Sequence, residues 1–125
     1  MTSILIADDD FISLEVLKAM LSSYPVTIQT AQNGKEAVDF AQQYQPALII
    51  LDYEMPEMTG AEACIALRAT AEFSETPIIA LTGHQSSTEL NVCREAGMNQ
   101  TLHKPVSLEA LQEVFRTYLP ELLNP

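Results

Sequence analysis

The chain has 125 residues, 47% of them hydrophobic and none of them tryptophan, so its length and composition fit one globular domain with an aliphatic core. Its net charge of −11, from 17 acidic and 6 basic residues, argues against direct binding to nucleic acid or to an anionic membrane, because both need a basic surface. No apolar run is long enough to span a membrane, and residues 1–6 lack the pattern of a secretory signal, which favours a soluble, cytoplasmic protein. Cys64 and Cys93 have no metal-binding or redox spacing and are expected to be reduced and buried.

Short apolar segments along the chain are predicted as strands. They occupy residues 3–7, 26–30, 47–51, 77–81 and 101–103. The second segment is the least apolar of them and is therefore expected at an edge of the sheet. Segments with the apolar spacing of a helix follow these strands in turn, at residues 11–24, 35–44, 60–68, 86–96 and 108–119.

Polar residues and glycine at the ends of these segments support the predicted helix bounds. Asp10, Ser86 and Ser107 are placed to cap the helices that follow them, and Ser86 forms a capping-box pattern with Glu89. Gly97 fits the C-terminal cap of the fourth helix.

The last residues permit two interpretations. Leu122, with Pro120 and Pro125 on either side, is typical of a short frayed tail. Alternatively, Tyr118, Leu119 and Leu122 complete the hydrophobic core instead of forming a surface for a partner.

Alternation of buried strands with helices predicts an α/β fold with a parallel sheet covered on both faces. Because the crossovers between parallel strands are right-handed, the carboxyl ends of all strands lie at one edge of the sheet. Ligands bind at that edge in folds of this kind.

Five chemically distinctive residues are expected at that edge: Asp8 and Asp9 after the first strand, Asp52 after the third, Thr82 after the fourth and Lys104 after the fifth. Carboxylates so close together repel one another unless a cation neutralises them. Oxygen ligands without a Cys or His cluster favour Mg²⁺ over zinc.

This set of residues suits phosphoryl transfer. With Mg²⁺ between Asp9 and Asp52, a free Asp52 oxygen can attack a phosphorus atom and form an acyl phosphate. Lys104 and Thr82 would then each neutralise one phosphoryl oxygen. Each residue alone has a commoner structural explanation, such as acids at a helix N-terminus or a solvated lysine. The convergence of all five on one edge favours a functional site.

The segments ILIADDD, LDYEMPEMTG, PIIALTG and AGMNQTLHKP together resemble the response-regulator receiver domain, across essentially the whole chain. The resemblance implies a flavodoxin-like (βα)5 fold with strand order 2-1-3-4-5. It also implies a single receiver domain over residues 1–125, with its core at about residues 3–119. The segment EAGMNQTLHKPVS is most similar to receivers fused to hybrid sensor kinases.

The resemblance further implies a role in a two-component system or phosphorelay. Asp52 would accept a phosphoryl group from the phosphohistidine of a sensor histidine kinase or a histidine phosphotransfer domain. Mg²⁺ would be bound by Asp9, Asp52 and the backbone carbonyl of Glu54, with Asp8 acting mainly through water.

Two further residues have implied roles in the modified state. Lys104 would hold the phosphoryl group, and Thr82 would turn inward to it. The Lys104-Pro105 peptide would be cis. Such a domain assists its own phosphorylation and dephosphorylation and is not an enzyme acting on separate substrates. Its output would pass to a downstream effector through the fourth helix, the fifth strand and the fifth helix.

The sequence departs from the family pattern at several positions. Thr101 stands where the family usually has the Tyr or Phe of a rotamer switch, so output is expected to use backbone shifts of the fourth helix instead. Gly83 replaces the usual Ala. Glu54 and His84, each two residues beyond a site residue, are hypothesised to set the lifetime of the phosphorylated state.

Two other functions fit part of the pattern. A Mg²⁺-dependent phosphohydrolase with an aspartyl-phosphate intermediate would use a second acid two residues after its nucleophile, a position that Glu54 fills. A pseudo-receiver that binds partners without phosphorylation would keep the fold alone. A nucleotide-binding flavodoxin-like protein is disfavoured, because no glycine-rich loop follows the first strand.

Overall fold

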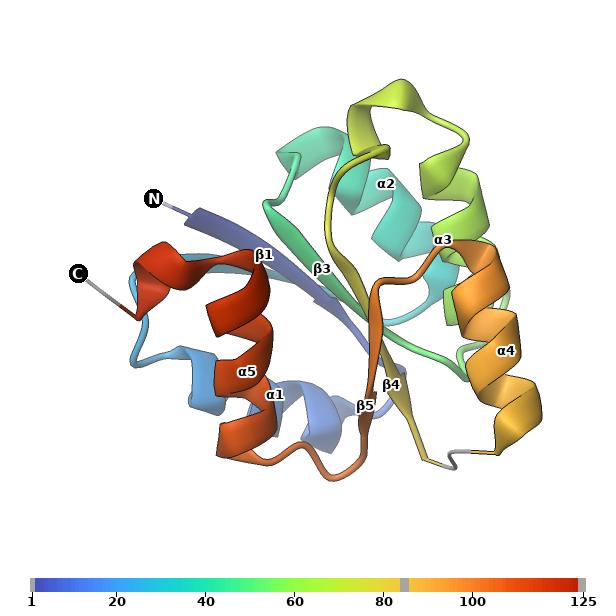
Figure 1. The fold of residues 1–125 in the computed structure, drawn as a ribbon. Helices are drawn as coiled ribbons and strands as arrows, with labels where there is room; N and C mark the ends of the chain where they lie inside the picture. Colours follow the sequence, from blue (N-terminus) through green and yellow to red (C-terminus); the bar gives the residue numbers. More distant parts are fainter. Residues whose placement is uncertain (1, 84–85, 124–125) are drawn as a thin grey trace.

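The computed structural model describes residues 2–83 and 86–123. In that part of the chain, the strands form one parallel sheet in the order β2-β1-β3-β4-β5 (Figure 1). The predicted flavodoxin-like α/β fold is confirmed, and so is the edge position of the second strand. The strands are β1 (Thr2–Ala7), β2 (Val26–Ala31), β3 (Leu48–Asp52), β4 (Ile78–Thr82) and β5 (Gln100–His103).

Helices lie on both faces of the sheet, with α1 and α5 on one face and α2, α3 and α4 on the other (Figure 1). They are α1 (Phe11–Leu21), α2 (Gly34–Tyr44), α3 (Gly60–Arg68), α4 (Ser87–Ala96) and α5 (Leu108–Tyr118), with 3-10 turns η1 (Ala71–Phe73) and η2 (Pro120–Leu122). Every residue of β3 and β4 is buried, because these strands are covered on both faces. No helix in the described ranges is long and apolar enough to cross a membrane.

The predicted helix caps are present. The side chains of Asp10, Ser86 and Ser107 each accept a hydrogen bond from a backbone N–H in the first turn of the next helix. Gly97 ends α4 with a φ of 100°, a left-handed conformation that glycine adopts without strain. The Ser86 hydroxyl accepts a hydrogen bond from the Glu89 N–H, which is one half of the predicted capping box. A full reciprocal capping box occurs at Thr59, before α3.

Helix α1 is shorter than predicted and ends at Leu21 instead of residue 24. The Ser22 hydroxyl donates to the Ala19 carbonyl oxygen at 2.7 Å, which competes with continuation of the helix. Pro25 also disfavours the α conformation at Tyr24, the residue before it.

The frayed tail expected from Pro120 onward is not found over residues 120–123, the part of it that the structure describes. Instead, Pro120–Leu122 forms the turn η2, and Leu119 and Leu122 are 7% and 6% exposed within the core beside α1 and α5. Burial of these two leucines outweighs the loss of chain entropy at this end. The alternative that they complete the core is confirmed.

Two glycines hold the loop between β3 and α3 close to its neighbours. A Cβ atom on Gly60 would clash with the carbonyl oxygen of Asp52, and one on Gly34 would clash with that of Met58. The Gly60 N–H also donates to the Tyr53 carbonyl oxygen at 3.0 Å. The position of Asp52 at the end of β3 therefore depends on the absence of a side chain at residue 60.

Replacement of Gly60 by alanine tests this packing. Gly60→Ala is expected to lower the free energy of unfolding by about 1–3 kcal/mol, because the new methyl group forces backbone apart. Urea unfolding followed by circular dichroism measures the change. Gly83→Ala is the matched control and should be near neutral, because none of the described residues lies within 4 Å of a Cβ placed there. Equal effects of the two substitutions would contradict the expectation.

Candidate functional site

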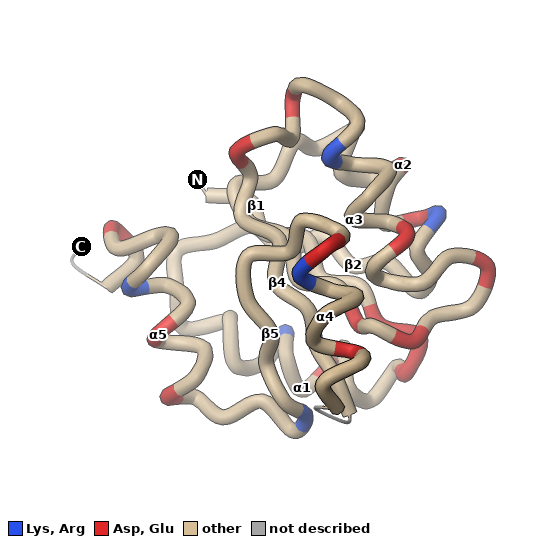
Figure 2. Tube along the Cα trace, turned by 45° about the vertical axis from the view of Figure 1, so that its right-hand side comes forward, with Lys and Arg blue, Asp and Glu red and all other residues tan. Residues whose placement is uncertain are grey.

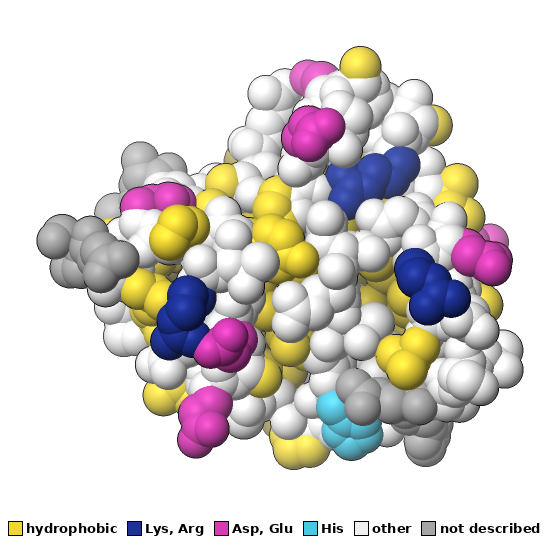
Figure 3. Space-filling model, in the orientation of Figure 1, with side chains coloured by type: hydrophobic (Ala, Val, Ile, Leu, Met, Phe, Trp, Pro, Cys, Tyr) yellow, Lys and Arg dark blue, Asp and Glu magenta, His cyan; other side chains and the backbone are white. Residues whose placement is uncertain are grey.

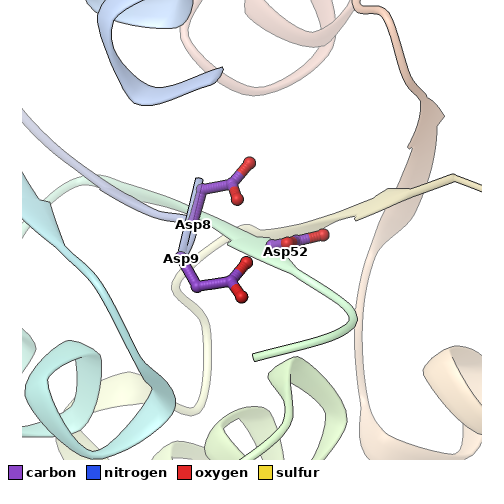
Figure 4. A group of neighbouring side chains, drawn as sticks. All are labelled: Asp8, Asp9 and Asp52. Atoms are coloured by element: carbon purple, nitrogen blue, oxygen red, sulfur yellow. The ribbon is translucent and has the colours of Figure 1, made fainter. Parts of the chain in front are cut away.

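Three carboxylates meet at the carboxyl edge of the sheet, as the sequence predicted. Asp8 and Asp9 follow β1, Asp52 ends β3, and one oxygen from each lies within 4.8 Å of the others (Figure 4). Asp8 and Asp52 are only 2% and 5% exposed, whereas Asp9 is exposed to solvent. The Asp10 N–H donates a hydrogen bond to the Asp8 Oδ1 atom at 2.9 Å, which helps to fix the Asp8 carboxylate.

Lys104, just after β5, joins this group. Its ammonium nitrogen lies 2.8 Å from Asp8 Oδ2 and 3.2 Å from Asp52 Oδ1. The Lys104 N–H donates to the Thr82 carbonyl oxygen at 2.9 Å, which ties the residue to the end of β4. The peptide to Pro105 is cis, as the resemblance implied. One cation is therefore shared between two buried anions.

The proton affinities reflect this imbalance of charge. Burial is the largest cause that raises the pKa of Asp52, the Asp8 carboxylate adds to it, and the nearby Lys104 ammonium opposes both, which leaves the pKa at about 7. For Lys104, burial acts to lower the pKa, but the hydrogen bond that its ammonium donates to Asp8 and the charges of Asp52 and Asp8 outweigh it and raise the pKa. The lysine is thus held in its charged form while Asp52 is poised between its two forms near neutral pH.

Thr82 ends β4 at the same edge. It is fully buried, and its hydroxyl oxygen has no hydrogen-bond partner among the described residues. An unpaired buried hydroxyl costs free energy, so it has an unused capacity to bind a ligand at this edge.

An open cavity of about 330 Å³ lies above the carboxylates. It is lined by Asp9, Asp10, Asp52, Tyr53, Glu54, Gly83 and Lys104. The Glu54 side chain is exposed, which suits a role at the mouth of the cavity. Thr101 is half-buried in β5 and is not among the lining residues, and His84 lies outside the described residues. The roles of these residues and of the Glu54 carbonyl stay predictions.

A second, apolar cavity of about 300 Å³ was not predicted from the sequence. It lies between α1 and residues 104–106 and includes Asp8 and Lys104 in its lining. Ile12 and Val16 of α1 line it and expose apolar side chains to solvent. In the sequence, this surface is indicated by apolar residues of α1 that lie outside the buried stripe of Leu14 and Leu17.

Basic residues do not gather on one face of the described structure. Lys and Arg are scattered over the structure among a larger number of acidic residues (Figure 2). The described surface therefore offers no basic face of the kind that nucleic acid binding requires.

Comparison with known proteins gives a consistent result. The family model "Response regulator receiver domain" matches residues 4–116. Response regulator MprA of Mycolicibacterium vanbaalenii is 36% identical over 116 residues, which are 93% of this chain and 49% of MprA. The chain spans half or less of the length of the curated relatives it matches.

Solved structures resemble the chain almost from end to end. The receiver domain of sensor histidine kinase PA1611 from Pseudomonas aeruginosa, described with a magnesium ion coordinated in its active site cleft, has a TM-score of 0.88 and 29% identity, covering 95% of this chain and 98% of that one. The receiver domain of Ssk1 from Saccharomyces cerevisiae was solved in complex with the histidine phosphotransfer protein Ypd1. The match to this structure has a TM-score of 0.86 and 27% identity, and it covers 94% of this chain and 88% of that one. Because both sequence and fold agree over most of its length, the chain belongs to the response regulator receiver domain family of two-component signalling.

Proposed function

We propose that this receiver accepts a phosphoryl group on Asp52 from the phosphohistidine of a sensor histidine kinase or histidine phosphotransfer domain. The observation that supports this most strongly is the shared lysine: Asp52 lies at an open edge, 3.2 Å from an ammonium that a second buried carboxylate also contacts. The similarity to a receiver solved with a phosphotransfer protein supports the class of donor. The modified domain would then change its affinity for a downstream effector.

The transfer requires a nucleophile and groups that neutralise charge. An Asp52 carboxylate oxygen forms a bond to phosphorus, the bond from phosphorus to the donor imidazole nitrogen breaks, and that nitrogen keeps the electron pair. Lys104 exchanges its contact with Asp52 for one with a phosphoryl oxygen. The Thr82 hydroxyl, which has no hydrogen-bond partner among the described residues, donates to another phosphoryl oxygen.

The donor set at this edge fits a hard divalent cation. Carboxylate oxygens from Asp8, Asp9 and Asp52 gather within 4.8 Å, and oxygen ligands suit Mg²⁺. Asp9, Asp52 and the Glu54 carbonyl would hold the ion directly, and Asp8 would act through water. Bound Mg²⁺ would offset the excess negative charge of the carboxylates and of the arriving phosphoryl group. The magnesium ion described in the PA1611 receiver supports this assignment.

Phosphorylation of the isolated chain tests the proposal directly. Incubation with phosphoramidate and Mg²⁺ is expected to add the mass of one phosphoryl group to the wild type. The same treatment of Asp52→Asn should add none, because the amide is not a nucleophile of this kind. Intact-mass spectrometry, with and without Mg²⁺, measures both.

Other outcomes separate the competing functions. Steady release of phosphate from added phosphomonoesters would favour a phosphohydrolase and contradict the proposal. No added mass together with no Mg²⁺ binding would indicate a pseudo-receiver. Equal addition to Asp52→Asn and wild type would place the modification at another residue.

Binding of Mg²⁺ is expected to depend on pH. Since the pKa of Asp52 is about 7 without metal, the ion has to displace a proton from that carboxyl group at lower pH. Affinity should therefore fall about tenfold per pH unit below 7 and level off above it. Isothermal titration calorimetry in buffers of different ionisation enthalpy measures the affinity and the proton released. An affinity unchanged from about pH 6 to about pH 8 would contradict the assigned pKa shift.

Glu54 and His84 are proposed to set the lifetime of the acyl phosphate. Glu54 is exposed and lines the cavity above Asp52, where it would meet a hydrolytic water. Replacing both by alanine is expected to change the rate of phosphoryl loss, followed by the decay of intact mass after removal of phosphoramidate. Glu57→Ala is the matched control, because Glu57 is an exposed acid of the same loop that does not line the cavity. Decay at the wild-type rate in the double variant would reject the role.

A further inference from the structure

The apolar cavity beside α1 is a second concave site on this fold. It has a volume of about 300 Å³ and lies between α1 and residues 104–106. Its apolar walls come from α1, from β4 and from the segment after β5, and they include Ile12, Val16, Leu17, Met20, Leu81 and Val106. Leu17 and Leu81 are 4% and 2% exposed, so the cavity reaches down to the core. Small-molecule sites in proteins are concave and mostly apolar in this way.

The size of the cavity restricts what can fill it. An apolar cavity of about half this volume admits benzene, so this one has room for about ten non-hydrogen atoms. One turn of a helix, about 10 Å wide and about 5.4 Å long, exceeds that volume. Ile12 and Val16 are 71% and 55% exposed, so a molecule bound beside them covers apolar surface that water now contacts. These dimensions favour a small apolar molecule over a helix of a protein partner.

The polar groups in the lining are largely paired with one another. Asp8 Oδ1 accepts from the Asp10 N–H at 2.9 Å, and Asp8 Oδ2 lies 2.8 Å from the Lys104 ammonium. The Ser13 hydroxyl donates to Asp10 Oδ2 at 3.2 Å. The Lys104 ammonium also lies 3.2 Å from Asp52 Oδ1. Because an ammonium has three N–H donors, Lys104 keeps one donor for a further acceptor, counted over the residues that the structure describes.

The charges around Lys104 select against a charged ligand. Two buried carboxylates share this one ammonium, so an anionic ligand meets surplus negative charge. A cationic ligand meets the ammonium itself, while Asp8, at 2% exposure, offers it little surface. A neutral molecule that carries a hydrogen-bond acceptor avoids both penalties and pairs with the remaining donor.

Apolar side chains also lie elsewhere on the surface. Figure 3 shows them along the middle of the face that contains α4, β5 and α5. Apolar contact alone does not select a ligand there, since exposed hydrophobic residues are normal on protein surfaces. The cavity beside α1 combines apolar walls with an ammonium group, and this combination specifies the chemistry of a ligand.

We propose that this cavity binds a small neutral molecule with an apolar body, such as one aromatic ring, and a single hydrogen-bond acceptor that pairs with Lys104. The proposal is independent of the phosphorylation of Asp52. Lys104 also lines the cavity above the carboxylates, so a ligand held here is separated from that site by one side chain.

NMR titration of the ¹³C,¹⁵N-labelled full chain with acetophenone tests the proposal. The amide resonances of residues 12, 16 and 106 and the Cε resonance of Lys104 are expected to shift, with a Kd of about 0.1–1 mM. The matched probe is α-methylstyrene, which has the same shape with a CH₂ group in place of the carbonyl oxygen. It should bind about tenfold more weakly and leave the Lys104 Cε resonance in place, because it has no acceptor.

Charged probes and two variants complete the experiment. Benzoate and benzylammonium should each bind more weakly than acetophenone. Val16→Trp fills the cavity and should abolish the shifts at residues 12 and 106. Ile65→Trp is the matched control and should keep them, because Ile65 is 56% exposed on α3, on the other face of the sheet.

Several results would overturn the proposal. Equal affinity for acetophenone and α-methylstyrene would show that no acceptor is recognised, and tighter binding of either charged probe would refute the argument from charge. Shifts that persist in Val16→Trp would place the ligand outside the cavity. No shift with any probe would leave the exposed side chains of α1 to a protein partner and exclude a small-molecule site.

Discussion

The structure depends on one electrostatic constraint, the burial of more negative than positive charge at the carboxyl edge of the sheet. Asp8 and Asp52 are both nearly inaccessible to solvent, and they share the single ammonium of Lys104. Desolvation of a carboxylate costs more than one shared cation returns, which is why the pKa of Asp52 rises to about 7. The fold tolerates this cost because the sheet and its helices bury enough apolar surface elsewhere.

That constraint explains why the same edge can respond to a ligand. A site with surplus negative charge gains stability from a divalent cation, and the buried hydroxyl of Thr82 gains it from an acceptor. Both gains occur at strand ends that continue into the loops before α3 and α4. A charge that arrives at this edge therefore acts on the backbone of these loops as well as on the side chains.

Much of this arrangement follows from the sequence alone. Alternating apolar segments predict a parallel sheet, the resemblance to receivers adds the strand order, and the strand ends place Asp8, Asp52, Thr82 and Lys104 at one edge. Local sequence pattern does not predict a residue with several distant partners, such as Arg68, whose four acceptors lie in two stretches, residues 73–76 and 97–99. At Leu122 the sequence leaves two interpretations open, since nothing local shows whether a chain between two prolines frays or turns back onto the core.

The two ends of the sheet differ in the way their polar groups are satisfied. At the amino edge, Arg68 and Asn99 satisfy backbone groups around η1, β4 and the end of α4 with direct hydrogen bonds. At the carboxyl edge, the Thr82 hydroxyl has no partner in the described ranges, and two acids compete for one lysine. Because packed elements move where their bonds are fewest, a rigid amino edge directs any rearrangement toward the carboxyl edge. Helix α4 runs between the two edges, and Arg68 holds its C-terminal end at the amino edge.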